Sequence, residues 1–274
     1  NNVEILIEDE KIIDIAPKIL DSDNVFDAKG ALITPGFIDS HTHPIFFGNR
    51  SSEFQMRARG KTYEEIASSG GGILSSINKL RDVNKNKLFD SSLEIVNYFL
   101  SHGTTTIEAK SGYGLTTIDE IKSLHVINKL NESSKLDIIP TFLGAHAFPD
   151  EFNNNHKGYI DLICNEMIPI IAKEKLAEYC DVFCEEGYFS IEESRKILQT
   201  ALDHNMKIRM HADEFIHSGA AELAAELGAV TADHLMAVSK EGMIAMKDKG
   251  VIATLLPGTT LFLAKSIYAK GREM

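Results

Sequence analysis

Two histidines separated by one residue are the first feature of the chain that could do chemistry. His41 and His43 end an apolar run that begins at Phe37. Alternate residues of a β-strand point to the same face, so both imidazoles could reach one cation. A single His-x-His pair is also common as a packed or surface pair, so the motif alone does not establish a metal site.

Two later motifs extend this pattern. His211 ends another apolar run and would be a third nitrogen donor, while Glu214 could orient and deprotonate a bound water. The adjacent acids Asp213 and Glu214 could equally be a solvated loop pair. His234 could bind metal, support a developing oxyanion, or make only a structural hydrogen bond. Together, the four histidines at the ends of apolar runs predict a metal site.

From Phe37 onward, short apolar runs alternate with stretches of helical period, which predicts repeated β/α units around a parallel sheet. We expect strands at 37–43, 104–109, 137–146, 181–185, 208–213, 230–235 and 251–256. We expect helices at 73–80, 87–102, 117–131, 159–173, 190–204, 217–227 and 240–249, with Thr117 and Ser190 as N-caps. Seven strands fit an α/β fold, a (β/α)8 TIM-like barrel whose eighth strand is missing from this chain. Catalytic residues of such barrels lie at the carboxyl ends of the strands, where the histidines fall.

The first 34 residues have a different texture. Short β-rich runs at 3–7, 12–15, 25–26 and 31–34 are separated by turn residues, which predicts a small β domain at 1–34 ahead of a barrel at 35–274. The chain starts at Asn1 without an initiator Met and stops at Met274 in mid-pattern. We therefore expect a chain truncated at both ends.

Composition excludes several classes of partner. The 274 residues have a formal net charge of −12, which argues against nucleic acid and anionic membranes because both require a basic surface. No apolar run approaches the ~18 residues of a membrane helix. Three cysteines in apolar surroundings suit a reducing compartment, so we expect a cytoplasmic protein.

The segment Pro35–His43 resembles the strand-one signature of the amidohydrolase superfamily, metal-dependent hydrolases on a distorted (β/α)8 barrel. The leading strands are similar to part of the small β-sandwich that many members build from both chain ends. Within the superfamily, the chain most resembles the imidazolonepropionase family, which opens the imidazolone ring in histidine degradation. The segments with this resemblance are 43–50, 108–115, 142–147, 210–215, 232–235 and 255–259.

The resemblance implies a role for each motif. It makes His41, His43 and His211 the ligands of one Zn or Fe ion per subunit. It makes Glu214 the acid–base residue, which also contacts the substrate, and it places His234 beside the attacking water. It assigns Arg50, Tyr113 and His146 to substrate binding. A guanidinium suits a carboxylate, and phenol and imidazole suit the amide-like ring edge.

The implied reaction is hydrolysis of the ring amide of the anionic small molecule 4-imidazolone-5-propionate to N-formimidoyl-L-glutamate, by a hydrolase of non-peptide carbon–nitrogen bonds. Strand four lacks the bridging lysine of many superfamily members, which favours a mononuclear site. The family's fourth ligand, an aspartate after strand eight, lies outside this chain. We expect Lys110 to pair with a nearby carboxylate, Cys184 to be a packed thiol, and the full-length protein to form a homodimer.

Two alternatives remain open at this point. A cytosine- or guanine-type deaminase of the same superfamily shares the histidine motifs, but a neutral base gives no reason for the set Arg50, Tyr113 and His146. A catalytically dead barrel that acts as a binding scaffold would be expected to have lost ligands, yet His41, His43, His211 and Glu214 are all present.

Overall fold

A computed structural model describes residues 3–20, 22–61, 65, 71 and 73–274, and the chain divides into two compact units at 1–36 and 37–274. In the first unit, β1 (Glu4–Glu8) and β2 (Lys11–Ala16) form an antiparallel hairpin, as two of the predicted runs require. The runs at 25–26 and 31–34 are not strands, and this part of the prediction is wrong. An extended segment becomes a strand only through a neighbour's hydrogen bonds, and no described strand pairs with either run.

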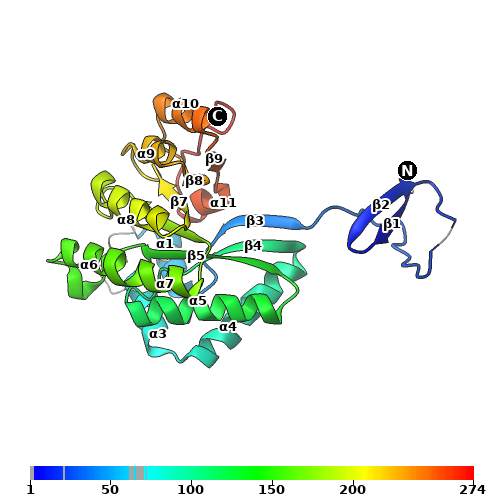
Figure 1. Ribbon diagram of the computed structural model, residues 1–274, viewed down its shortest axis with the longest axis horizontal. Coiled ribbons are helices and arrows are strands. Elements are labelled where there is room, and N and C mark those ends of the chain that lie inside the picture. The colour runs from blue at the N-terminus through cyan, green and yellow to red at the C-terminus, as the bar shows by residue number, and fades with distance from the viewer. Residues whose placement is uncertain (1–2, 21, 62–64, 66–70, 72) are drawn as a thin grey trace. The chain divides into compact units, whose positions relative to one another are not determined.

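The second unit is built on a seven-stranded sheet in which each strand pairs in parallel with the next along the chain (Figure 1). The strands are β3 (Phe37–Thr42), β4 (Thr104–Lys110), β5 (Asp137–Ala145), β6 (Tyr179–Cys184), β7 (Lys207–Ala212), β8 (Thr231–His234) and β9 (Ile252–Thr254). This order confirms the predicted α/β fold of consecutive parallel strands. The last strand, β9, is shorter than the predicted 251–256.

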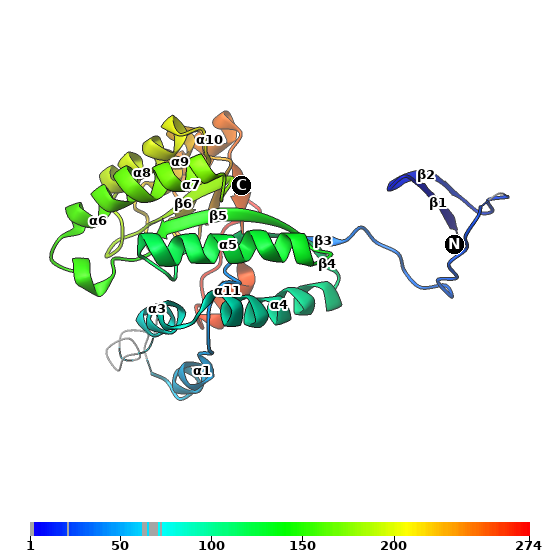
Figure 2. The same cartoon turned by 60° about the horizontal axis from the view of Figure 1, so that its bottom comes forward.

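Helices follow most strands and pack on the outside of the sheet: α4 lies on β4, α5 on β5, α8 on β6 and β7, and α9 on β7 (Figure 2). The helices are α1 (Ser51–Ala58), α3 (Ile73–Asp82), α4 (Lys85–Ser101), α5 (Thr117–Ser133), α6 (His156–Leu162), α7 (Ile168–Glu174), α8 (Ile191–Asp203), α9 (Ala220–Leu227), α10 (Lys240–Lys249) and α11 (Pro257–Phe262). A short 3₁₀ turn (Asp150–Phe152) precedes α6. The single helix predicted at 159–173 is α6 and α7, joined by a π turn (Ile163–Met167). The sequence did not predict α1 and α11.

The helix N-caps show how the sequence sets the boundaries. Ser190 and Glu193 form the predicted capping box at the start of α8. The cap of α5 is Thr116 rather than the predicted Thr117, because Thr116 is extended and its hydroxyl accepts the backbone N–H of Asp119. The hydroxyl of Thr117 instead donates to Glu166. Within the described part of the chain, every helix is too short or too polar to span a bilayer.

The core lies between the sheet and these helices. Completely buried side chains include Ile107 in β4, Leu124 and Ile127 in α5, and Ile197 in α8. Burying each such side chain contributes about 1.5–3 kcal/mol. The strands of this packed layer end together at one rim, and that rim holds the histidines.

Candidate active site

Three histidine nitrogens converge at the carboxyl ends of β3 and β7. The Nε2 atom of His43 lies 3.2 Å from Nε2 of His41 and 3.4 Å from Nε2 of His211. Nitrogen ligands at ~2.0–2.1 Å from a tetrahedral zinc ion are separated by roughly 3.3 Å. Both separations from His43 therefore fit neighbouring ligands of one metal ion, and the structure brings together the three residues predicted as ligands.

His234, at the end of β8, lies against the same cluster. One ring nitrogen of His234 and one each of His41 and His211 all lie within 4.8 Å of one another, close enough to share a metal ion. Its Nδ1 is 3.5 Å from Oε1 of Glu214. The geometry thus places His234 beside both the metal position and the acid, where it can act as a ligand or as a neighbour of the reacting atoms.

The burial of these rings sets their charge. Burial is the largest cause that lowers the pKa of His41 and His43 well below the ordinary value, and the Lys110 ammonium and neighbouring imidazoles act in the same direction. Burial, with the nearby His211, lowers the pKa of His234 to about 3. Neutral imidazole is the form that binds a metal, so these rings are ready for a cation at neutral pH.

Buried carboxylates orient two of the rings from behind. Oδ2 of Asp233 lies 2.6 Å from Nδ1 of His41, and Oδ2 of Asp181 lies 3.0 Å from Nδ1 of His211. The contact to His41 is a hydrogen bond, whereas the contact to His211 has ion-pair distance without hydrogen-bond geometry. A carboxylate that accepts from Nδ1 keeps the proton there and leaves Nε2 bare, which is the arrangement common around metal ligands. Sequence analysis missed this role of Asp181 and Asp233. The available signal was an acidic residue inside an otherwise apolar strand, because a buried carboxylate needs a partner.

Glu214 follows β7 and is 7% exposed. Burial raises its pKa from 4.5 to about 7, although His211 opposes the shift; the neighbouring Glu185 raises it further. A carboxyl group with a pKa near neutrality can both accept and donate a proton. Asp213 is also fully buried, where Oδ1 accepts the backbone N–H of Ser218 and Oδ2 that of Ala221. The alternative of a solvated acidic loop is therefore wrong. The same two hydrogen bonds hold the segment before α9 outside the helix, so α9 starts at Ala220 rather than at the predicted 217.

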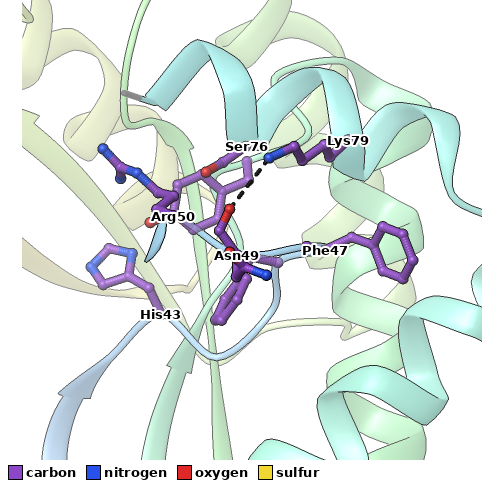
Figure 3. Close-up of a pocket in the computed structure, with 9 residues that line it drawn as sticks. His43, Phe47, Asn49, Arg50, Ser76 and Lys79 are labelled. Atoms are coloured by element: carbon purple, nitrogen blue, oxygen red, sulfur yellow. Dashed lines mark hydrogen bonds between the residues drawn. The ribbon is translucent and has the colours of Figure 1, made fainter. Parts of the chain in front are cut away.

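A cavity of about 250 Å³ opens directly beside His43. Its lining includes Arg50 and Tyr113, two of the predicted substrate-binding residues, together with Phe47, Asn49 and Lys79. Figure 3 shows the imidazole of His43 and the guanidinium of Arg50 on the same side of this cavity. Nε of Arg50 donates to Oε2 of the buried Glu53 at 2.8 Å, which fixes the direction of the guanidinium.

The third predicted binding residue, His146, lies against two residues of the cavity wall, His43 and Tyr113, and is not itself part of that wall. Its ring stacks on His43 with centroids 5.0 Å apart, and Tyr113 lies 5.2 Å away. Nδ1 of His146 bonds to the carbonyl oxygen of Gly112 at 2.8 Å. Gly112 has a φ of +105°, and a Cβ there would lie 2.8 Å from the carbonyl oxygen of Leu143, so only glycine fits. The structure thus gathers Arg50, Tyr113 and His146 around one site.

Comparison with known proteins shows which enzymes the chain resembles. The chain is 48% identical over 272 residues to an imidazolonepropionase of Thermoanaerobacter pseudethanolicus, a match that covers 98% of this chain and 65% of the relative. It is 45% identical to the imidazolonepropionase of Caldanaerobacter subterraneus subsp. tengcongensis, covering all of this chain and 66% of that protein. Over nearly its whole length, the chain is similar to these imidazolonepropionases. It spans slightly less than two thirds of the length of these imidazolonepropionases. No family model matches the chain.

Solved structures of other enzymes share the fold. A variant of the atrazine chlorohydrolase of Arthrobacter aurescens, complexed with zinc and atraton, superposes with a TM-score of 0.72 at 16% identity, over 99% of this chain and 64% of that one. The guanine deaminase of C. acetobutylicum gives a TM-score of 0.70 at 15% identity, over 96% of this chain and 64% of that one. At these identities the two likenesses establish the fold alone.

Proposed function

We propose that this chain hydrolyses the ring amide of 4-imidazolone-5-propionate and releases N-formimidoyl-L-glutamate. The observation that supports this most directly is one cavity lined by both a metal-ligand histidine, His43, and a carboxylate-binding residue, Arg50. A cyclic amide with an anionic tail is the kind of substrate that needs both groups in one cavity. The histidine cluster would promote hydrolysis of the ring amide, and Arg50 in the cavity wall would bind the anionic tail.

The donor set fits one zinc or iron ion, held by His41, His43 and His211. All three contribute an imidazole, and the Nε2 atoms have the spacing of ligands around one small cation. A divalent ion there would lower the pKa of a water toward neutrality and polarise the ring carbonyl. No lysine stands in β6, so one ion rather than a lysine-bridged pair is proposed.

Arg50 and its neighbours hold the substrate. The guanidinium, directed by Glu53, would bind the propionate carboxylate with paired charge-assisted hydrogen bonds. The phenol of Tyr113 and the imidazole of His146 would face the amide-like edge of the ring. Held in this way, the ring carbonyl carbon lies toward the histidine cluster, and the attack becomes effectively unimolecular.

Glu214 would move the proton. It accepts a proton from the attacking water as a bond forms between the water oxygen and the ring carbonyl carbon. His234 stabilises the negative charge that develops on the carbonyl oxygen. Glu214 then delivers the proton to the ring nitrogen as the carbon–nitrogen bond breaks, so that one water is added and the ring opens.

The competing functions gain less support. A deaminase acting on a neutral base has no use for Arg50 in the cavity wall. A dead scaffold has no use for a buried acid, clustered histidines and the carboxylates that contact them. We also propose that the protein acts in the cytoplasm as a homodimer. We further propose that residues 1–34 are part of a composite β-sandwich domain and that residues 35–274 are a barrel domain.

The test is turnover by the complete gene product loaded with zinc or iron. We expect the ultraviolet absorbance of the imidazolone to fall, and a Glu214→Gln variant to lose this activity. Wild-type turnover in the variant would remove the proposed role of Glu214. Guanine and cytosine serve as comparison substrates: release of ammonia from either, without imidazolone turnover, would favour the deaminase.

A further inference from the structure

A lysine ammonium lies buried beneath the histidine cluster. Lys110 ends β4, and its side chain is completely buried. Its Nζ lies 2.8 Å from Oε1 of Glu108, 2.7 Å from Oδ2 of Asp181 and 3.9 Å from Oδ2 of Asp233. One cation therefore meets carboxylates from three strands: β4, β6 and β8.

The charge on Lys110 is held in place by these carboxylates. Burial alone would lower the pKa of the ammonium, but Asp181, Glu108 and Asp233 outweigh this effect and raise the pKa above its ordinary value. A buried ion pair contributes little net stability compared with apolar residues of the same size. Removing one partner, however, leaves the other charges buried without an opposite charge, which is strongly destabilising. The cluster therefore invites a functional explanation beyond folding.

The same carboxylate oxygens serve both the lysine and the histidines. Oδ2 of Asp181 contacts Nζ of Lys110 and also Nδ1 of His211. Oδ2 of Asp233 contacts Nδ1 of His41 and lies within ion-pair distance of the same Nζ. The position of Lys110 thus determines where the acceptors for two histidine rings stand.

Glu108 links the cluster to the His-x-His motif itself. Oε2 of Glu108 accepts the backbone N–H of Thr42, the residue between the two histidines, at 3.3 Å. The hydroxyl of Thr42 donates to the carbonyl oxygen of Glu108 at 2.6 Å. The backbone between His41 and His43 is therefore tied to the strand that supplies Lys110.

We propose that Lys110 is a positioning residue that, through Asp181 and Asp233, fixes the ring orientation and tautomer of His211 and His41. In this arrangement both rings carry the proton on Nδ1 and present a bare Nε2 to the centre of the site. The inference rests on the metal role proposed for these histidines. It is tested separately because its first readout needs neither metal nor substrate.

The first experiment records long-range ¹H–¹⁵N spectra of the histidine rings in the metal-free complete gene product. In the wild type we expect His41 and His211 to be protonated on Nδ1. In Lys110→Met, the carboxylates lose their cation and spread apart, so we expect both rings to show mixed or Nε2-protonated tautomers. Wild-type tautomers in a folded Lys110→Met variant would overturn the proposal, whatever the activity of the enzyme proves to be.

The second readout is metal affinity. Loss of an outer partner of a metal ligand commonly weakens binding by 10–100-fold, so we expect the zinc Kd of Lys110→Met to rise by about 10-fold or more, with an altered Co²⁺ absorption spectrum. Should Lys110→Met fail to fold, Lys110→Arg provides the same test. Its larger planar cation cannot occupy the same point, so a weaker zinc affinity is expected, and an unchanged zinc Kd overturns the proposal.

Lys122 provides a matched control. It is a half-buried lysine in α5 whose Nζ donates to Oδ1 of Asp119 and to the carbonyl oxygens of Leu80 and Val83. Lys122→Met removes a comparable paired ammonium that has no described contact with the histidines. We expect lower stability but wild-type tautomers and zinc affinity. If Lys122→Met shifts the tautomers and affinity as strongly as Lys110→Met, a general loss of packing explains both results and the positioning role is overturned.

Discussion

Replacing Glu214 by glutamine should stabilise the metal-free protein while it removes activity. The carboxyl group is 7% exposed, and burial raises its pKa from 4.5 to about 7. Above the ordinary pKa, the unfolded chain gives up this proton more readily than the folded chain does. The free energy of unfolding therefore falls as pH rises from about 4.5 through 7, and the full destabilisation is present above that range.

The size of the effect follows from the shift. A difference of about 2.5 pKa units at ~1.4 kcal/mol per unit corresponds to about 3 kcal/mol of destabilisation at pH 8. At pH 5 the folded group is almost entirely protonated, and the penalty falls to roughly 1 kcal/mol. Glu214→Gln removes the titration, so its stability advantage over the wild type should be about 2 kcal/mol larger at pH 8 than at pH 5.

The assay is urea unfolding of metal-free wild type and Glu214→Gln at both pH values, followed by circular dichroism. The control is Glu94→Gln in α4, which makes the same chemical change at an exposed glutamate. The reasoning fails if the stability difference between wild type and Glu214→Gln does not depend on pH, because the carboxyl group would then have no raised pKa in the folded protein.

Three further variants test other parts of the site and fold. Arg50→Met should lower kcat/KM for the propionate substrate by roughly 10–100-fold, the worth of a charged hydrogen bond, and leave turnover of the neutral propionamide analogue nearly unchanged; equal losses for both would contradict the carboxylate contact. Gly112→Ala should lower Tm and raise KM, because the new Cβ would meet the carbonyl oxygen of Leu143 at 2.8 Å and Nδ1 of His146 at 3.1 Å; wild-type values would show that the turn adapts. Ser190→Ala should cost about 1 kcal/mol and lower Tm by roughly 2–4 °C with unchanged kcat, as loss of a capping box at a helix that supplies none of the site residues predicts.

The barrel strands and the histidine cluster could be predicted because both depend on local patterns. Apolar runs alternating with helical stretches give parallel strands, and a parallel sheet places all the strand ends at one rim. The positions of His41, His211 and His234 at those ends then bring them together without further information. The substrate-binding roles of Arg50, Tyr113 and His146 were predicted from the resemblance to a known family and not from a local sequence pattern.

The missed features depend on contacts between distant residues. Lys110 reaches Asp181 across 71 positions, and Asp233 meets His41 across 192, so no local spacing reveals either pair. Residues 25–26 and 31–34 have β-rich composition but no ladder partner among the described strands. Whether such a run finds a partner depends on the tertiary structure and cannot be read from its composition. Helix α11 was missed because its six residues are too few to show a helical pattern. The ring of Phe262, at its end, stacks on Phe54 of α1, a contact between residues far apart in the sequence.

Isotope transfer from water tests the central claim most directly. The zinc- or iron-loaded complete gene product is incubated with 4-imidazolone-5-propionate in ¹⁸O-enriched water, and the product is analysed by mass spectrometry. Hydrolysis of the ring amide predicts N-formimidoyl-L-glutamate with one ¹⁸O in the carboxylate formed from the ring carbonyl, and no release of ammonia. Release of ammonia with the ring intact, or no conversion by the metal-loaded protein, would contradict the proposed reaction.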